Sequence, residues 1–225
     1  MTERLALFPL GTVLLPGLLL PLEIFEQRYR VLVADLLDLA AGEPRRFGVV
    51  AIRHGRETGT DRIPVLHEIG CTANLRRVDP HADGRFSIVT SGGARFRVLA
   101  VDQTSRPYLM GDVEYLSDGI GDAQEAAAQV PVVAKLLRDY AARLATSRAA
   151  EIRLPDLPDD PRMLSYVVAA SMVTQTAERQ ALLAAPDAAA RLRAERTILR
   201  RELGLLERFT AIASDEHIRI TPSAN

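Results

Sequence analysis

The stretch FPLGTVLLPGLLLPLEIFEQRYRVLV, residues 8–33, decides how the first half of the chain folds. Short apolar runs in and just before this stretch are separated by the Pro-Leu-Gly turn at residues 9–11 and by Pro16-Gly17. Proline and glycine are the strongest local breaks in regular structure. The sequence therefore predicts short strands at Leu5–Phe8, Val13–Leu15 and Leu18–Leu20.

The end of the same stretch changes to the periodicity of a helix. Its apolar residues recur at spacings of three and four, which predicts an amphipathic helix whose apolar stripe covers the strands. Gly42 and Pro44 are expected to end it. The stripe consists of Phe25, Tyr29, Leu32, Val33, Leu36 and Ala40.

Strand-like patterns continue downstream to about residue 115. Ile69–Arg76 and Leu109–Tyr115 alternate apolar and polar residues, which is typical of half-buried strands, and Gly92-Gly93 is expected to form a turn. Several short strands at this spacing favour a closed or nearly closed barrel. Further strands are expected at Phe47–Ile52, Phe86–Thr90 and Arg95–Val101.

The second half of the chain has helical signals. Asp122 and Glu125 are placed like an N-cap and its N3 partner, and Pro131 is expected to kink that helix or to start a new one. Asp160-Pro161 is typical of a cap followed by the first helical residue. Later helices are expected around 178–184 and from about 187 to 213.

These patterns predict two parts of the chain. Residues 1–120 form a β-barrel subdomain, and residues 121–225 form an α-helical subdomain that ends in a disordered tail after Ser214. No long linker separates the two.

Composition excludes several classes of function. A formal net charge of −1 creates no overall field for polyanions, which argues against a dedicated nucleic-acid binder. The single cysteine, Cys71, excludes an internal disulfide. Because no apolar segment is long enough for a signal peptide or a membrane span, a cytoplasmic location is expected.

The quoted stretch resembles the opening signature of the amino-terminal domain of the Lon protease family. The matching elements are Phe8-Pro9-Leu10, residues 13–17, Pro21-Leu22, residues 24–26 and Arg28-Tyr29. Later segments agree in order and character, including residues 47–50, 69–71, 93–96, 107–109 and the closing helical region.

The resemblance implies an α+β fold: a pseudouridine-synthase-and-archaeosine-like (PUA-like) β-barrel with one covering helix, followed by a C-terminal α-helical bundle. In the full-length protease this part helps to engage protein substrates and to assemble the hexamer, so a homo-oligomer is one alternative here. An ATPase and a peptidase follow it there. This chain ends before either, which predicts a stand-alone, non-catalytic member.

The residues agree with an absence of catalysis. A P-loop needs a lysine in a glycine-rich loop, whereas Lys135, the only lysine, is expected on a helix face. His67, Glu68 and Cys71 do not make a metal site, because strand alternation separates Glu68 from the other two and structural zinc commonly uses paired cysteines. No cofactor, metal or catalytic residue is expected.

The candidate contacts lie in the opening signature and on a later strand. Glu26 and Arg28 fit a local ion pair, or alternatively the polar rim of a peptide groove. Arg95 and Arg97 should project from one strand face, which is either solvated or in contact with a polyanion. The candidate peptide-contact residues are Pro16, Gly17, Leu18, Pro21, Glu26 and Arg28.

The leading hypothesis is a module that recognises proteins or unfolded peptide segments, through exposed apolar side chains or through strand addition at an open barrel edge. The main alternative is an RNA-binding PUA-like domain, although few aromatic residues are available for base stacking. A peptidase would need a serine activated by Lys135. A small-molecule sensor is a further alternative, for which the sequence offers no ligand chemistry.

Overall fold

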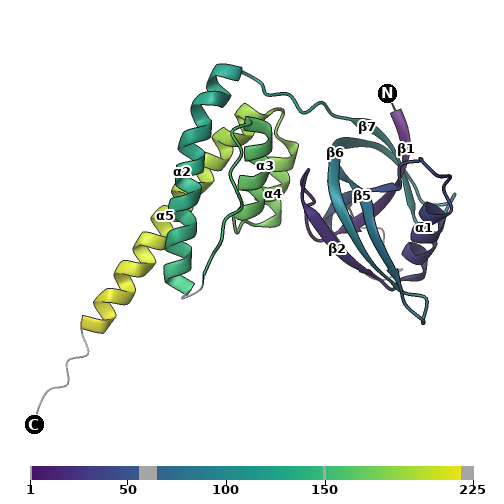
Figure 1. Cartoon of the computed structure of the whole chain (residues 1–225), viewed down its shortest axis with the longest axis horizontal. Coiled ribbons are helices and arrows are strands. Elements are labelled where there is room, and N and C mark those ends of the chain that lie inside the picture. Colours follow the sequence, from purple (N-terminus) through teal and green to yellow (C-terminus); the bar gives the residue numbers. More distant parts are fainter. Residues whose placement is uncertain (1, 56–64, 149–150, 219–225) are drawn as a thin grey trace, which may run out of the picture. The chain divides into compact units, whose positions relative to one another are not determined.

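The computed structural model describes residues 2–55, 65–148 and 151–218 (Figure 1). The chain divides into two compact units. Residues 1–118 and 174–184 make up the first unit, and residues 119–173 and 185–225 make up the second. The prediction of a mixed fold of strands and helices is confirmed.

The first unit contains all the described strands and two helices. In chain order these are β1 (Thr2–Leu10), β2 (Leu19–Ile24), α1 (Gln27–Leu37), β3 (Arg46–His54), β4 (Val65–Leu66), β5 (Ile69–Pro80), β6 (Phe86–Asp102), β7 (Leu109–Tyr115) and α4 (Thr176–Ala184).

The strands pair into a ring. Their order is β1-β7-β6-β5-β3, and β1 also pairs in parallel with β3, so that Leu7 lies beside Gly48 and Leu10 beside Ala51. β2 stands outside this ring and pairs antiparallel with the first part of β6. One buried cluster of the ring consists of Leu5, Leu7, Val50, Phe96 and Val113.

α1 buries the apolar stripe that its sequence predicts. Tyr29, Leu32, Val33 and Leu36 are buried, and the rings of Tyr29 and Phe8 stack with their centroids 3.9 Å apart. The helix is shorter than its apolar pattern, because it begins at Gln27 and ends at Leu37. Phe25 therefore precedes the helix and takes no part in the stripe.

The opening signature contacts β6 through a close backbone approach. Gly17, at φ +82°, donates its N–H to the carbonyl of Gly92 at 2.9 Å, and the Gly92 N–H donates to Leu18 at 2.7 Å. β6 runs straight through Gly92 and Gly93, so the turn expected there is wrong. Val13–Leu15 is buried but forms no strand. Gly92 serves this approach of the opening segment and does not end β6.

α4 belongs to the first unit, although it follows two helices of the second in the chain. The side-chain amide of Gln180 donates to the carbonyl of Ile69 on β5 at 2.8 Å, and a guanidinium N–H of Arg95 on β6 donates to Leu183 at 2.9 Å. The predicted division at residue 120 put α4 into the helical part. The observed division differs from the predicted one, because contacts between elements far apart in the chain leave no pattern in the local sequence.

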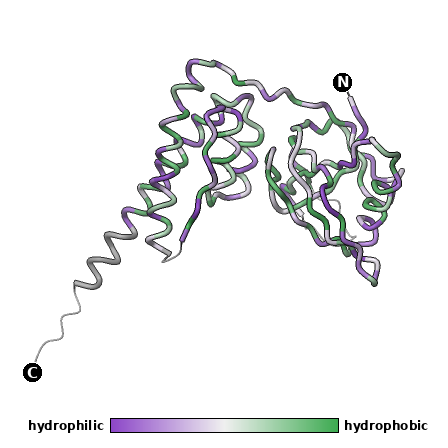
Figure 2. The backbone as a smooth tube through the Cα atoms, viewed as in Figure 1, coloured by the Kyte–Doolittle hydropathy of each residue, from purple (hydrophilic) through white to green (hydrophobic). Residues whose placement is uncertain are grey.

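The second unit consists of α2 (Ala123–Arg148), α3 (Pro161–Ser171) and α5 (Ala188–Ile218). α2 and α5 lie side by side and run in the same direction, because Glu125 pairs with Arg193 and, further along both helices, Arg143 pairs with Glu207 (Figure 1). Hydrophobic and hydrophilic residues both occur along α2 (Figure 2), as its amphipathic pattern requires.

Two predicted caps are present at helix starts. Asp122 accepts from the Glu125 N–H at 2.9 Å, and Asp160 accepts from the N–H groups of the two residues after Pro161. Pro131 lies inside α2 and starts no new helix. α5 continues past Ser214 to Ile218. The remainder of the predicted disordered tail, residues 219–225, lies outside the described residues.

Two ionisable residues of α5, Arg191 and Glu195, are buried inside the second unit. The apolar pattern of α5 in the sequence did not predict this. The Arg191 side chain is fully buried, donates to Ser165 Oγ at 2.8 Å, and places its guanidinium carbon 4.0 Å from the ring centroid of Tyr166. Glu195, one turn later, is also fully buried, and neither carboxyl oxygen has a hydrogen-bond partner within the described chain. Burial raises the pKa of Glu195 well above its usual range, against the opposing effect of Arg191.

Within the described ranges, no helix has both the length and the apolar character needed to cross a lipid bilayer.

Candidate functional site

Side-chain exposure alternates along β2 and its flanks. Gly17 and every second residue from Leu19 to Phe25 are exposed, whereas the residues between them are half-buried or buried. Such a period of two is typical of a strand with one face against the core. We call the exposed set the β2 row: Leu19, Pro21, Glu23 and Phe25.

Two large apolar side chains dominate the β2 row. Leu19 is 68% exposed and Phe25 is 56% exposed, although burying either would be favourable by about 1.5–3 kcal/mol. Pro21 lies between Leu19 and Glu23 and is also exposed. Single apolar residues scattered on a surface are ordinary, but three exposed apolar residues on one side of a strand, interrupted only by Glu23, indicate an interaction surface.

A small cavity lies at the Phe25 end of the row. Its volume is about 150 Å³, and the end of β1 and the start of α1 contribute to its wall. The stacked rings of Phe8 and Tyr29 make part of that wall, so its chemistry is largely apolar. The lining residues are Phe8, Pro9, Leu10, Leu22, Glu23, Ile24, Phe25, Glu26 and Tyr29.

Polar groups border the row and the cavity. Ser87 Oγ donates to the Glu23 carboxylate at 2.9 Å and lies 2.7 Å from His81 Nε2. Arg28 pairs with Glu26 at 2.8 Å, and the Arg28 guanidinium carbon lies 4.5 Å from the ring centroid of Tyr29. The local ion pair predicted for Glu26 and Arg28 is therefore present beside the cavity.

The predicted peptide-contact residues lie on one continuous segment but differ in accessibility. Gly17 and Pro21 are exposed, whereas the other four are half-buried. Leu19 and Phe25 were not among the predicted contact residues, because Leu19 was placed only in a predicted strand and Phe25 in the apolar stripe of the helix. Their spacing could have revealed them. In an extended segment every second side chain points the same way, so Leu19, Pro21, Glu23 and Phe25 lie on one side. The half-buried four are Pro16, Leu18, Glu26 and Arg28.

Arg95 and Arg97 do not share a surface. Arg95 is only 3% exposed, and its guanidinium donates to the carbonyls of Leu183 and Ser117, both at 2.9 Å. Arg97 is exposed and lies 3.4 Å from Glu114. The expectation that both project from one solvated or polyanion-binding face is wrong for Arg95, because α4 covers that side of β6.

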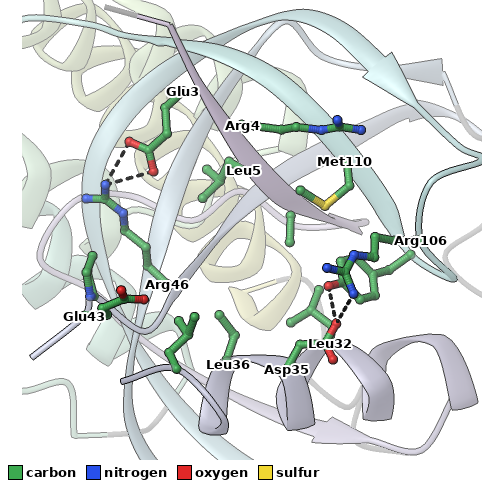
Figure 3. Close-up of a pocket in the computed structure, with 14 residues that line it drawn as sticks. Glu3, Arg4, Leu5, Leu32, Asp35, Leu36, Glu43, Arg46, Arg106 and Met110 are labelled. Atoms are coloured by element: carbon green, nitrogen blue, oxygen red, sulfur yellow. Dashed lines mark hydrogen bonds and ion pairs between the residues drawn. The ribbon is translucent and has the colours of Figure 1, made fainter. Parts of the chain in front are cut away.

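A larger concavity lies between β1 and α1, with a volume of about 410 Å³ (Figure 3). Glu3 and Arg46 lie on one side of it at 2.9 Å, and Asp35 and Arg106 lie on the other at 3.4 Å, with Leu5 between them. These charges already neutralise one another in pairs. Arg4 also lines the concavity and pairs with Asp102, so five of its six charged side chains lie in ion pairs and Glu43 is the sixth.

Tyr108 strengthens the wall of that concavity. Its hydroxyl donates to Asp35 at 2.6 Å. Burial, together with this hydrogen bond to a carboxylate, raises the pKa of Tyr108 to about 12. The phenol is therefore a fixed donor at physiological pH and not a general base.

Among the described side chains, the candidate nucleophile Cys71 and the single lysine Lys135 are both poorly placed for catalysis. Cys71 is buried, and burial raises the pKa of its thiol to about 12, which disfavours the thiolate that a nucleophile needs. Lys135 is exposed and pairs with Asp139 one turn later at 2.7 Å, as expected of a solvated helix residue. The described residues contain no group of three or more potential ligands placed to hold a metal ion.

Comparison with known proteins identifies the family. The family model of the ATP-dependent protease La (LON) substrate-binding domain matches residues 4–201. The chain belongs to the Lon substrate-binding domain family. The resemblance seen in residues 8–33 is thereby confirmed over most of the sequence.

Relatives within the Lon family are much longer than this chain. The Lon protease of Anaeromyxobacter dehalogenans is 28% identical over 212 residues, which cover 93% of this chain and 24% of that protein. Lon protease 1 of Herpetosiphon aurantiacus is 25% identical, covering 91% and 25% respectively. The chain thus spans about a quarter of the length of these curated relatives.

Solved structures from the Lon family have a similar fold. A Lon N-terminal domain protein from Xanthomonas campestris is 25% identical, with a TM-score of 0.59 and coverage of 85% of this chain and 95% of that one. The N-terminal domain of Lon protease from the Mycobacterium avium complex gives a TM-score of 0.62 at 19% identity, with coverage of 90% and 98%. These matches give the chain the Lon N-terminal domain fold.

Proposed function

We propose that this chain is a non-catalytic recognition module that binds segments of unfolded or client proteins through the β2 row. Its membership of the Lon substrate-binding domain family suggests the recognition of protein substrates. The β2 row supplies a surface of suitable chemistry, because Leu19 and Phe25 are both exposed and Phe25 lines an apolar cavity.

The observation that carries this proposal is the exposure of Leu19 and Phe25 on one strand face. An unfolded segment offers apolar side chains that a folded protein hides. Covering the two exposed side chains and filling the cavity removes apolar surface from water on both partners. Recognition of this kind selects for unfolded character and not for one sequence.

The non-catalytic part of the proposal is supported by the family model, which describes a substrate-binding domain. The buried thiol of Cys71 and the solvated Lys135 agree with it. RNA binding is not favoured, because the comparisons give it no support and Arg95, one of the two arginines considered for a polyanion, is buried.

We also propose that the ring of strands is a PUA-like barrel and that α2, α3 and α5 form the C-terminal bundle. The parallel β1–β3 pairing that closes the ring supports the first assignment. A cytoplasmic location is proposed on the single, buried cysteine.

Binding of a reduced and alkylated protein, measured by fluorescence anisotropy, tests the recognition function. The variant with Leu19→Ser and Phe25→Ser together should bind it about tenfold more weakly or worse, corresponding to about 1.4 kcal/mol. Leu99→Ser is the matched control, because Leu99 is 54% exposed on β6 outside the row. Equal binding by the double variant, or an equal loss in the control, would overturn the proposal.

A further inference from the structure

We propose that the free edge of β2 accepts an extended client segment as an additional strand, with a basic residue beside Glu23. The inference rests on the proposed function and specifies how the client is held. Two features of β2 support it: an outer edge that pairs with no other described strand, and the charge of the β2 row.

The orientation of the β2 backbone follows from its bonds to β6. Gly92 N–H donates to the carbonyl of Leu18 at 2.7 Å, and the Thr90 hydroxyl donates to that of Leu20 at 3.0 Å. Backbone groups alternate in direction along an antiparallel strand. The groups of Leu19, Pro21 and Glu23 therefore face away from β6, and among the described strands β2 pairs with β6 alone.

This edge can hold a second strand, but only loosely. Leu19 and Glu23 each offer an N–H and a C=O, whereas Pro21 has no N–H and offers only its C=O. Proline is a common device for blunting an edge strand against uncontrolled pairing. The edge is thus suited to reversible binding of a client and poorly suited to stacking copies of this chain.

The side chains of the row define the chemistry of the segment. Residues that lie opposite one another on paired strands interact, and opposite charges attract there. Glu23 is the only charged member of the row, so it favours lysine or arginine beside it and disfavours acidic residues. Leu19 and Phe25 favour apolar neighbours, and the cavity of about 150 Å³ is of a size to take one apolar side chain.

Backbone pairing is tested with a fluorescent peptide of alternating valine and threonine that carries one central lysine. Two versions are N-methylated at every second residue, one along each edge of the extended peptide. One version should bind at least about tenfold more weakly than the unmethylated peptide, and the other should bind within about twofold of it. Binding should also slow the amide hydrogen exchange of Leu19 and Glu23.

Pro21→Ala tests the same edge from the side of the protein, because it restores an N–H at the centre of the edge. It should tighten binding of the unmethylated peptide about threefold. Pro107→Ala is the matched control, since Pro107 is exposed in the segment between β6 and β7. This control should leave the affinity unchanged.

The charge preference is tested by exchange of charges. Glu23→Lys should weaken binding of the lysine peptide and strengthen binding of a peptide with glutamate at the same position. Affinities that follow only the apolar content of the peptide would overturn the charge preference.

The outcomes separate the two proposals. If peptides bind but both methylated versions bind equally, and Pro21→Ala changes nothing, strand addition is wrong while the recognition function stands. If neither peptides nor unfolded protein bind, the recognition function itself fails. Selective loss with one methylated edge, together with slowed exchange at Leu19 and Glu23, supports strand addition.

Discussion

Gly92 faces the carbonyl of Leu15 so closely that a β-carbon at position 92 would lie 2.1 Å from that oxygen. The nearest atoms are backbone, which has little freedom to move aside. The Leu15–Gly17 turn and β6 can therefore meet only where β6 has a glycine. This contact holds the start of β2 in place.

Gly92→Ala should destabilise the first unit by about 1–3 kcal/mol, the usual cost of overpacking a tight site. Denaturant unfolding measures the change. Gly204→Ala is the control, because a β-carbon there meets no heavy atom within 4 Å and lies in α5. That control should stabilise the protein by about 1 kcal/mol. A stable Gly92→Ala variant would mean that the contact does not constrain the fold.

Arg95→Met should destabilise the first unit by about 3–5 kcal/mol, since it leaves the carbonyls of Leu183 and Ser117 without their donor. Amide exchange within α4 should also accelerate. Arg97→Met is the control, because Arg97 is exposed and its pairing with Glu114 is worth at most about 1 kcal/mol. Equal effects of the two variants would contradict the role of Arg95 in holding α4.

Glu195 should make the second unit less stable as pH rises. Its folded-state pKa is raised above the ordinary value near 4.5, so the stability it contributes is fully present below that value. That contribution is lost as the pH rises through the raised pKa. Unfolding free energies measured from about pH 5 to pH 8 should fall in the wild type.

Glu195→Gln should flatten this dependence and raise the stability at the alkaline end of the range. A glutamine keeps the shape of the side chain and has no proton to lose. The same slope in wild type and variant would show that another group controls the pH dependence.

Cys71 should resist thiol reagents in the folded protein. With the pKa of its thiol raised to about 12, the thiolate fraction at pH 8 is roughly a thousandfold below that of an ordinary cysteine. Reaction with a chromogenic disulfide should be slow in buffer and fast in denaturant. Fast reaction in buffer would place Cys71 in a different environment.

Local sequence patterns predicted the helices and strands better than they predicted which other segments pack against them. The helix stripe of Tyr29, Leu32 and Leu36 and the Asp160 cap depend on neighbours in the chain, and both are as expected. Gly92 was interpreted as part of a turn. A glycine that lets two backbone segments approach closely cannot be distinguished, from sequence alone, from one that a turn requires.

The candidate site was predictable in place but not in detail. The sequence singled out residues 16–28, which overlap the proposed β2 row, but it did not distinguish the outward side of β2 from its inward side. Arg95 illustrates the remaining limit. Alternation put it with Arg97 on one face, but α4, about 88 positions later in the chain, covers it.

The return of the chain to the first unit at α4 has a consequence for synthesis on the ribosome. Arg95 and Ile69 emerge long before Leu183 and Gln180, the residues that satisfy their polar groups. The ring of strands therefore lacks the covering helix α4 until more than half of the second unit has been translated. A fragment that ends at residue 120 would lack α4 altogether. A truncated chain that folds its first unit completely therefore has to extend past residue 184.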